Sequence, residues 1–178
     1  TLGVGTVAAK AGLRSGTFNL LGLGADDVLS EARGTGRYRV LESPNLFVRF
    51  IGFDLRPVTA GAPGRPNLVA RAEVREAIDL AIDRPRLARA VSSTAVPTSH
   101  IVPAAVFGHD EGALPAAHDP ALARQLLAKA GYPKGLDIVL HRPNAFRRAA
   151  EELAAQLGEA GIRVTVEMHR SSDFFAAL

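Results

Sequence analysis

Residues 135–169 read GLDIVLHRPNAFRRAAEELAAQLGEAGIRVTVEMH and carry the clearest fold signal in the chain. The segments 135–142 and 162–169 are short and rich in apolar residues, which predicts strands. The segment 145–161 between them has apolar residues at helical spacing and ends at a glycine, which predicts a helix. Two strands joined by a helix form a parallel βαβ unit with a right-handed crossover. The stretch therefore predicts an α/β fold in which helices flank a mixed β-sheet.

Residues 73–91, EVREAIDLAIDRPRLARAV, predict a pair of helices upstream of this unit. Apolar residues recur at positions i, i+3, i+4, i+7 and i+8, which gives one apolar stripe on a helix. Asp83 is placed to cap a second helix, and Pro85 falls in its first turn. Arg75 and Asp79 lie four residues apart on the charged face and can pair. We interpret these charges as the solvent-exposed side of a packed helix pair rather than as a functional surface.

The rest of the chain alternates helical and strand patterns with long loops. Residues 92–118 form a 27-residue stretch without a convincing period. A loop of this length inside a compact domain is either functional or wrapped around a partner surface. The remaining predicted elements are helices at 7–14, 25–34 and 119–131, strands at 18–24, 37–43 and 46–55, and a loop at 56–70.

Composition limits the classes of protein that the chain can belong to. With 178 residues, 47% of them hydrophobic, the chain can bury the core of one domain or one large lobe. The net charge is +3, but arginines alternate with acids along the chain instead of gathering in one place, so we expect no nucleic-acid partner. No apolar run reaches the ~18 residues of a membrane span, and the start TLGVGTVAAKAG lacks the features of a secretory signal. The lack of cysteine excludes disulfides and thiolate chemistry.

Motifs typical of enzymes are missing. The sequence has no GxSxG motif, no P-loop and no evident nucleophile–base pair. At 21–27, LGLGADD has Asp27 where a dinucleotide-binding loop has its third glycine, and that acid would repel a pyrophosphate. No histidine pair shows a recognised ligand spacing. We therefore expect no enzyme, no cofactor and no metal; the histidines are His100, His109, His118, His141 and His169.

The strongest candidate site is HRPNAFRR, residues 141–148, which joins a strand to a helix. Ligands of open α/β sheets bind beyond the carboxyl ends of strands. Arg142 can form a bidentate pair with a carboxylate, Asn144 offers an amide, and Phe146 offers a flat apolar wall. His141 is included in this candidate ligand site. An arginine exposed to solvent in a loop is the alternative interpretation.

Several segments resemble one family of proteins. The sequences VREAIDLAIDRPRLARAV (74–91), SHIVPAAVFGHD (99–110) and HDPALARQLLAKAGYPKGLDIVL (118–140) follow one another in the order and spacing of the family 5 extracellular solute-binding proteins. These are the binding components of peptide- and nickel-type ABC importers. LRSGTFNLLGL (13–23) and FVRFIGFDL (47–55) resemble the segments where such proteins enter their last large lobe, so the resemblance covers nearly the whole chain.

The resemblance implies one lobe of a type II periplasmic-binding-protein-like fold, in which two lobes enclose a cleft. Residues 1–178 would be a single carboxyl-side lobe, truncated before its last strands, with 1–45 as the inter-lobe crossing region. The implied function is that of an extracytoplasmic, periplasmic or cell-surface-anchored component that binds a peptide-like or other small solute. Its partners would be that ligand and a membrane permease, and it would act as a monomer. The alternative is a ligand-sensing domain of the same fold in a transcription regulator, whose helix-turn-helix domain would lie outside this segment.

The resemblance also assigns roles to residues. Arg142 and Pro143 match the Arg-Pro pair that follows this strand in dipeptide-type members, where the arginine holds the ligand carboxylate. Phe50 and Gly52 fall on the crossing strand, where peptide binders often carry an aromatic residue and an acid. Phe146 falls where other members present a pocket side chain. The expected site has no catalytic residue and no metal ligand, and its members are Arg142, Asn144, Phe146, Phe50, Gly52 and His141.

Overall fold

The computed structural model describes residues 6–18, 20–21, 26–43, 46–59, 64–110, 112, 116–143, 147–170 and 172–175. The chain divides into two compact units, residues 1–46 and 47–178. None of the helices in the described ranges combines the length and the apolar character that crossing a membrane requires.

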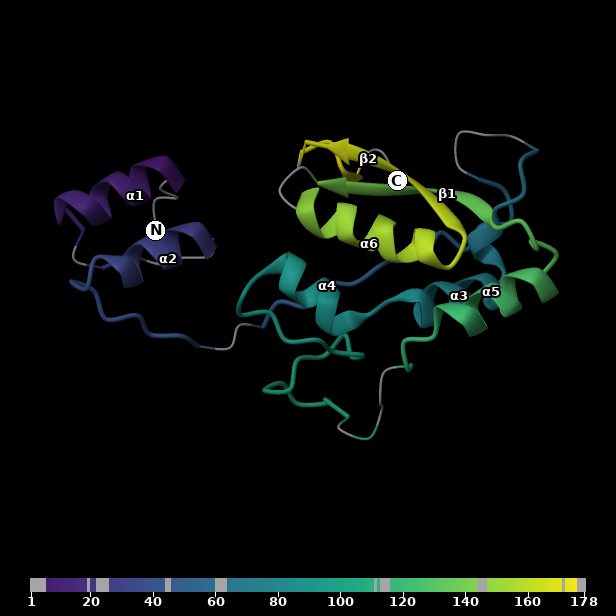
Figure 1. Ribbon diagram of the computed structural model, residues 1–178, viewed down its shortest axis with the longest axis horizontal. Helices are drawn as coiled ribbons and strands as arrows, with labels where there is room; N and C mark the ends of the chain where they lie inside the picture. Colours follow the sequence, from purple (N-terminus) through teal and green to yellow (C-terminus); the bar gives the residue numbers. More distant parts are fainter. Residues whose placement is uncertain are drawn as a thin grey trace. The chain divides into compact units, whose positions relative to one another are not determined.

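The first unit is a pair of helices, α1 (Thr6–Ser15) and α2 (Asp26–Gly34) (Figure 1). Both were predicted from the sequence. Arg14 on α1 donates from two guanidinium nitrogens to the two carboxylate oxygens of Glu31 on α2, each at 2.8 Å. The apolar faces of the two helices form a small core of Ala9, Leu13, Val28 and Ala32.

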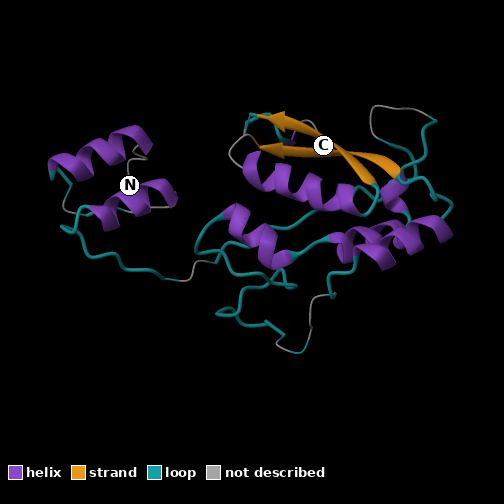
Figure 2. Ribbon diagram, viewed as in Figure 1, coloured by secondary structure: helices purple, strands orange, loops and turns teal. Residues whose placement is uncertain are grey.

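The second unit contains the predicted βαβ unit. Strand β1 (Leu136–Pro143) leads into helix α6 (Arg147–Glu159), and β2 (Ile162–His169) returns beside β1 (Figure 2). The two strands pair in parallel, with Leu136 opposite Ile162 at one end and Pro143 opposite His169 at the other. The predicted α/β class, with helices packed on a sheet, is therefore confirmed.

Four further helical segments precede the βαβ unit: η1 (Leu68–Ala70), α3 (Ala72–Ala81), α4 (Arg84–Val91) and α5 (Pro120–Lys129). The Asp83 carboxylate accepts the backbone N–H of the third residue of α4, and Asp119 caps α5 in the same way. A capping carboxylate satisfies an N–H group that has no partner inside its helix. Both caps are followed by a proline, so the predicted starts of these helices are confirmed.

Helix α6 packs against the sheet and against α3 and α4, while α5 packs on α3 (Figure 1). The side chains that meet between these elements are almost all aliphatic, and their removal from water is the main stabilising term of the unit. Among the described residues this core comprises Val74, Ala77, Ile78, Ala81, Ile82, Ala123, Leu127, Leu136, Leu153, Leu157, Ala160 and Ile162.

One amide lies in this apolar layer and links α6 to the start of α4. Gln156 is 1% exposed. Its Oε1 accepts the backbone N–H of Asp83 at 2.9 Å, and its Nε2 donates to Glu152 at 2.8 Å. A buried polar side chain is tolerated when its hydrogen-bonding groups have partners, as they do here.

We expect Gln156→Leu to lower the free energy of unfolding by about 1–3 kcal/mol, because the substitution leaves the Asp83 N–H without its acceptor. The size of the side chain is nearly unchanged, so packing contributes little to the loss. Urea unfolding measures the change, with Gln125→Leu on the exposed face of α5 as the matched control. The control should stay within ~0.5 kcal/mol of the parent, and an equal loss in both variants would contradict this role of Gln156.

Two predicted strands are not strands in the structure. In their described residues, the segments 37–43 and 46–55 form no strand and join no ladder. An extended apolar segment becomes a strand only when a neighbouring strand pairs with its backbone groups. Ile51 and Phe53 still pack on the core, so burial alone produced the strand-like pattern. Most of the strand predicted at 18–24 lies outside the described residues.

The predicted ion pair between Arg75 and Asp79 is also wrong. Arg75 donates instead to the backbone carbonyls of Val69 and Ala70, at 3.1 and 2.7 Å. Asp79 pairs with Arg84 at the start of α4. The predicted loops, by contrast, are confirmed where the structure describes them, apart from the single turn η1 and an isolated bridge between Val58 and Pro66.

Candidate functional site

Arg142 lies near the carboxyl end of β1 and is half-buried. Side chains alternate between the two faces of a strand, so Arg142 shares the face of Ile138 and Leu140, which pack on the core. Burial lowers the pKa of the Arg142 guanidinium, and the positive charge of Arg49 lowers that pKa further. The positive charges of Arg142 and Arg49 favour the approach of an anionic group. A guanidinium can hold a carboxylate with two parallel hydrogen bonds.

Phe50 and Gly52 lie on the extended segment that contains Arg49. Phe50 is 65% exposed, while Ile51 beside it packs on the core. A Cβ added to Gly52 would stand 4.0 Å from the nearest atom, a ring carbon of Phe50, so space does not demand glycine at this position. An exposed phenyl ring next to a residue without a side chain offers a flat apolar surface.

Two of the predicted site residues, Asn144 and Phe146, lie outside the described residues. Their expected roles follow from the sequence alone. Pro143, which precedes them, is the last residue of β1 and lies opposite His169 on β2.

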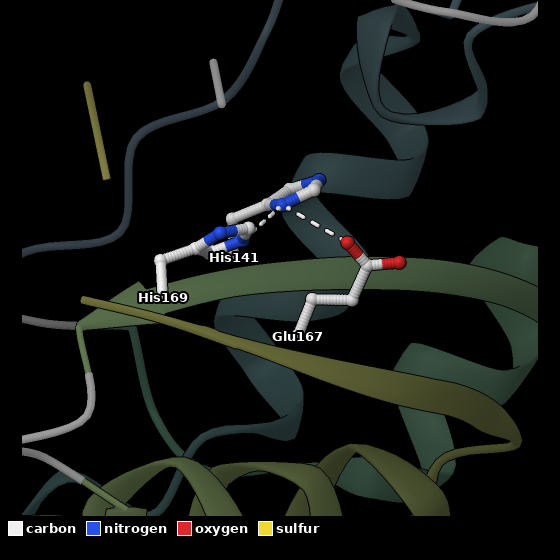
Figure 3. A group of neighbouring side chains, drawn as sticks. All are labelled: His141, Glu167 and His169. Carbon is white, nitrogen blue, oxygen red and sulfur yellow. Dashed lines mark hydrogen bonds and ion pairs between the residues drawn. The ribbon is translucent and has the colours of Figure 1, made fainter. Parts of the chain in front are cut away.

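His141 is close to two side chains of β2 (Figure 3). Its Nδ1 lies 3.0 Å from Nε2 of His169 and 3.5 Å from a carboxylate oxygen of Glu167. The two imidazole rings are stacked, with 5.2 Å between their centroids. Since neighbouring residues of a strand point to opposite faces, His141 and Arg142 are on opposite faces of the sheet. The predicted site residues therefore do not form a single cluster around Arg142.

No recognised ligand spacing marks this group in the sequence, because its members come from two strands. His141 is the last but one residue of the strand predicted at 135–142, while Glu167 and His169 are separated by one residue at the end of the strand predicted at 162–169. A period of two places Glu167 and His169 on one face, and parallel pairing brings the ends of both strands together. The period of two and the parallel pairing together could have predicted this cluster from the sequence.

A shallow hollow between α4 and α6 is lined by side chains of both charges. Arg86 of α4 pairs there with Glu152 and Glu159 of α6, at 2.6 and 2.9 Å. The pairs join two helices that already pack on each other, so we interpret this hollow as part of a surface ion network rather than as a binding site.

The chain matches the family described as bacterial extracellular solute-binding proteins, family 5 Middle, over residues 5–177. It is 30% identical over 131 residues to the glutathione-binding protein GsiB of Escherichia coli O6:K15:H31, an alignment that covers 71% of this chain and 24% of GsiB.

The solved structures similar to this one include HbpA2 of Haemophilus parasuis and a dipeptide binding protein of Pseudoalteromonas sp. SM9913. HbpA2 of Haemophilus parasuis aligns with a TM-score of 0.73 and 23% identity, over 97% of this chain and 34% of HbpA2. A dipeptide binding protein of Pseudoalteromonas sp. SM9913, solved in complex with Met-Leu, aligns with a TM-score of 0.57 and 26% identity, over 62% of this chain and 23% of that protein.

The match over nearly the whole chain shows that the protein belongs to family 5 of the bacterial extracellular solute-binding proteins. The resemblance inferred from the sequence is therefore confirmed. The chain spans about a quarter of the length of the curated relatives that it matches, and so corresponds to part of a lobe of such a protein.

Proposed function

We propose that this chain is part of the extracytoplasmic solute-binding component of an ABC importer. The observation that carries the proposal is the family match over residues 5–177. Similar proteins are named for binding glutathione or a dipeptide, which supports a peptide-like or other small solute as the ligand. In this proposal the chain contributes part of one of two lobes, with residues 1–45 crossing between the lobes, and the solute lies in the cleft.

The proposed recognition is non-covalent. Arg142 binds an anionic group of the solute, and Phe50 covers an apolar part of it beside Gly52. The half-buried position of Arg142 supports this role, because a charged hydrogen bond is stronger where water is partly excluded. Asn144 and Phe146 complete the proposed set and orient the solute, whereas His141 lies on the opposite face of the sheet from Arg142 and has no part in it.

Transport then follows from the two-lobe arrangement. A solute that contacts both lobes favours the closed form over the open one, in proportion to its difference in affinity for the two. The closed form docks on a membrane permease. In this proposal the receptor works as a monomer, outside the cytoplasm, without catalysis, a resident cofactor or nucleic acid.

Native mass spectrometry of the complete gene product tests this function. We expect a small molecule to co-purify with the protein and to leave it on mild activation, with a mass that identifies the solute. Calorimetric titration with the identified compound, and with a panel of dipeptides and tripeptides, should then show one binding event per protein. A gene product that binds neither a co-purified compound nor any member of the panel would contradict the proposal.

A further inference from the structure

We propose that His141, Glu167 and His169 form a binding site for a divalent transition-metal ion on the outer face of the sheet (Figure 3). The three side chains offer two imidazole nitrogens and one carboxylate oxygen, and these donor atoms all lie within 4.8 Å of one another. The site is separate from the solute-recognition role proposed for Arg142 and does not depend on it.

The backbone of the sheet places the three donors together. His141 is opposite Glu167 in the register of β1 and β2, and His169 is two residues further along β2. Paired residues of a parallel ladder project to the same face, and so do residues two apart on one strand. The opposite face of the same strands packs on the core, through Ile138, Leu140 and Val164. The three side chains therefore share the outer face because the register requires it.

The distances between the donor atoms suit their coordination of one metal ion. Zinc binds histidine nitrogen at ~2.0–2.1 Å and carboxylate oxygen at ~2.0–2.2 Å, so tetrahedral ligands lie roughly 3.3 Å apart. In this structure Nδ1 of His141 is 3.0 Å from Nε2 of His169 and 3.5 Å from the Glu167 carboxylate. The donor atoms of Glu167 and His169 also lie within 4.8 Å of each other, so rotation of the side chains can direct all three donors at one point. Both histidines are half-buried, and the ring of Phe174 lies 6.4 Å from that of His169.

The donor set selects the kind of ion. Imidazole nitrogen suits Zn²⁺, Ni²⁺ and Cu²⁺, whereas Mg²⁺ and Ca²⁺ require oxygen ligands. Neutral imidazoles and one carboxylate bring a single negative charge to the cation. Three protein donors leave at least one coordination position open, for water or for a donor atom of another molecule.

The alternative is a polar cluster held together by a hydrogen bond between the two imidazoles. In that arrangement one ring carries the N–H and the other accepts it. Metal binding requires lone pairs on both nitrogens, so the donating ring must move its proton to its other nitrogen. The two accounts differ in one measurable respect, which is whether an ion binds at this place.

Calorimetric titration of the metal-free protein with Zn²⁺, and separately with Ni²⁺, tests the proposal. We expect one ion per chain, with an affinity that a large excess of Mg²⁺ or Ca²⁺ leaves unchanged. Each of His141→Gln, His169→Gln and Glu167→Gln should weaken binding by ~10-fold or more, since losing even an outer-shell partner of a metal ligand has an effect of that size. Co²⁺ should give a visible absorption band that all three variants reduce.

The matched control is His118→Gln, which removes an exposed histidine of the long loop. We expect this variant to bind Zn²⁺ as the parent does. Circular dichroism and the thermal midpoint confirm that each variant is folded, and Glu167→Gln keeps the shape of its side chain. Absence of a one-ion event, or equal affinity in the parent and all three site variants, would overturn the metal site. The assay contains no solute, so that result leaves the receptor proposal untouched.

Discussion

Gly135→Ala is expected to destabilise the second unit far more than the same substitution four residues earlier, at Gly131. Both glycines have a positive φ, +77° at Gly135 and +96° at Gly131, so both alanines incur the cost of a left-handed conformation, ~1–2 kcal/mol. The surroundings differ. A Cβ on Gly131 would meet no atom within 4 Å, whereas a Cβ on Gly135 would stand 1.9 Å from the backbone oxygen of Gly161.

That oxygen belongs to the first contact between the two strands. It accepts the backbone N–H of Leu136 at 3.2 Å, at the end of the ladder where Leu136 lies opposite Ile162. An alanine at position 135 must push this carbonyl away, which disturbs both the hydrogen bond and the register beyond it. We therefore expect a loss of about 3 kcal/mol or more for Gly135→Ala and ~1–2 kcal/mol for Gly131→Ala.

Urea unfolding followed by far-UV circular dichroism measures both losses in parallel. If Gly135→Ala is too unstable to purify while Gly131→Ala folds, the result agrees with the expected larger loss of stability at position 135. Equal unfolding midpoints for the two variants would show that the close approach of Gly135 to Gly161 is not required.

The second large effect concerns binding. In the complete gene product, Arg142→Ala should weaken the binding of a carboxylate-bearing solute by ~2 kcal/mol or more, which is about 30-fold in Kd. The physical reason is the loss of a charged, bidentate partner at a half-buried position, where the solute carboxylate would remain partly desolvated. Arg142→Lys should recover only part of the affinity, because an ammonium group lacks the planar pair of donors.

Calorimetry with the solute identified by mass spectrometry gives these affinities. The matched control is Arg89→Ala, which removes an exposed arginine of α4 in the same unit. Equal affinity for the parent and Arg142→Ala would remove Arg142 from the solute site while leaving the fold and the family intact. A loss that is equal in Arg89→Ala would point to overall charge rather than to a specific contact.

Local signals predicted the helices and the βαβ unit well. The motifs Asp-x-Pro at the start of α4 and Asp-Pro at the start of α5 predict a capping carboxylate followed by a proline. Both caps form in the structure. The apolar spacing of residues 73–91 placed Val74, Ala77 and Ile78 in the core, where they are at most 2% exposed. These features depend on residues within one or two helical turns, so no knowledge of distant partners was needed.

Features that depend on residues distant in the sequence were harder to predict from the sequence. The apolar pattern of 46–55 predicted a strand, but pairing depends on a neighbouring strand that the segment itself does not encode. The cluster of His141, Glu167 and His169 was missed for a related reason, because its members become neighbours only through the register of β1 against β2. The role proposed for Arg142 rests on family resemblance and on its position near the carboxyl end of β1.

The most direct test of the account is a crystal structure of the complete gene product with its solute bound. We predict that the solute lies beyond the carboxyl end of β1, with an anionic group in contact with the Arg142 guanidinium and an apolar part against Phe50. A solute bound without contact to any residue of 47–178, or an Arg142 side chain sealed in the core away from the ligand, would contradict the claim that this chain supplies a recognition surface.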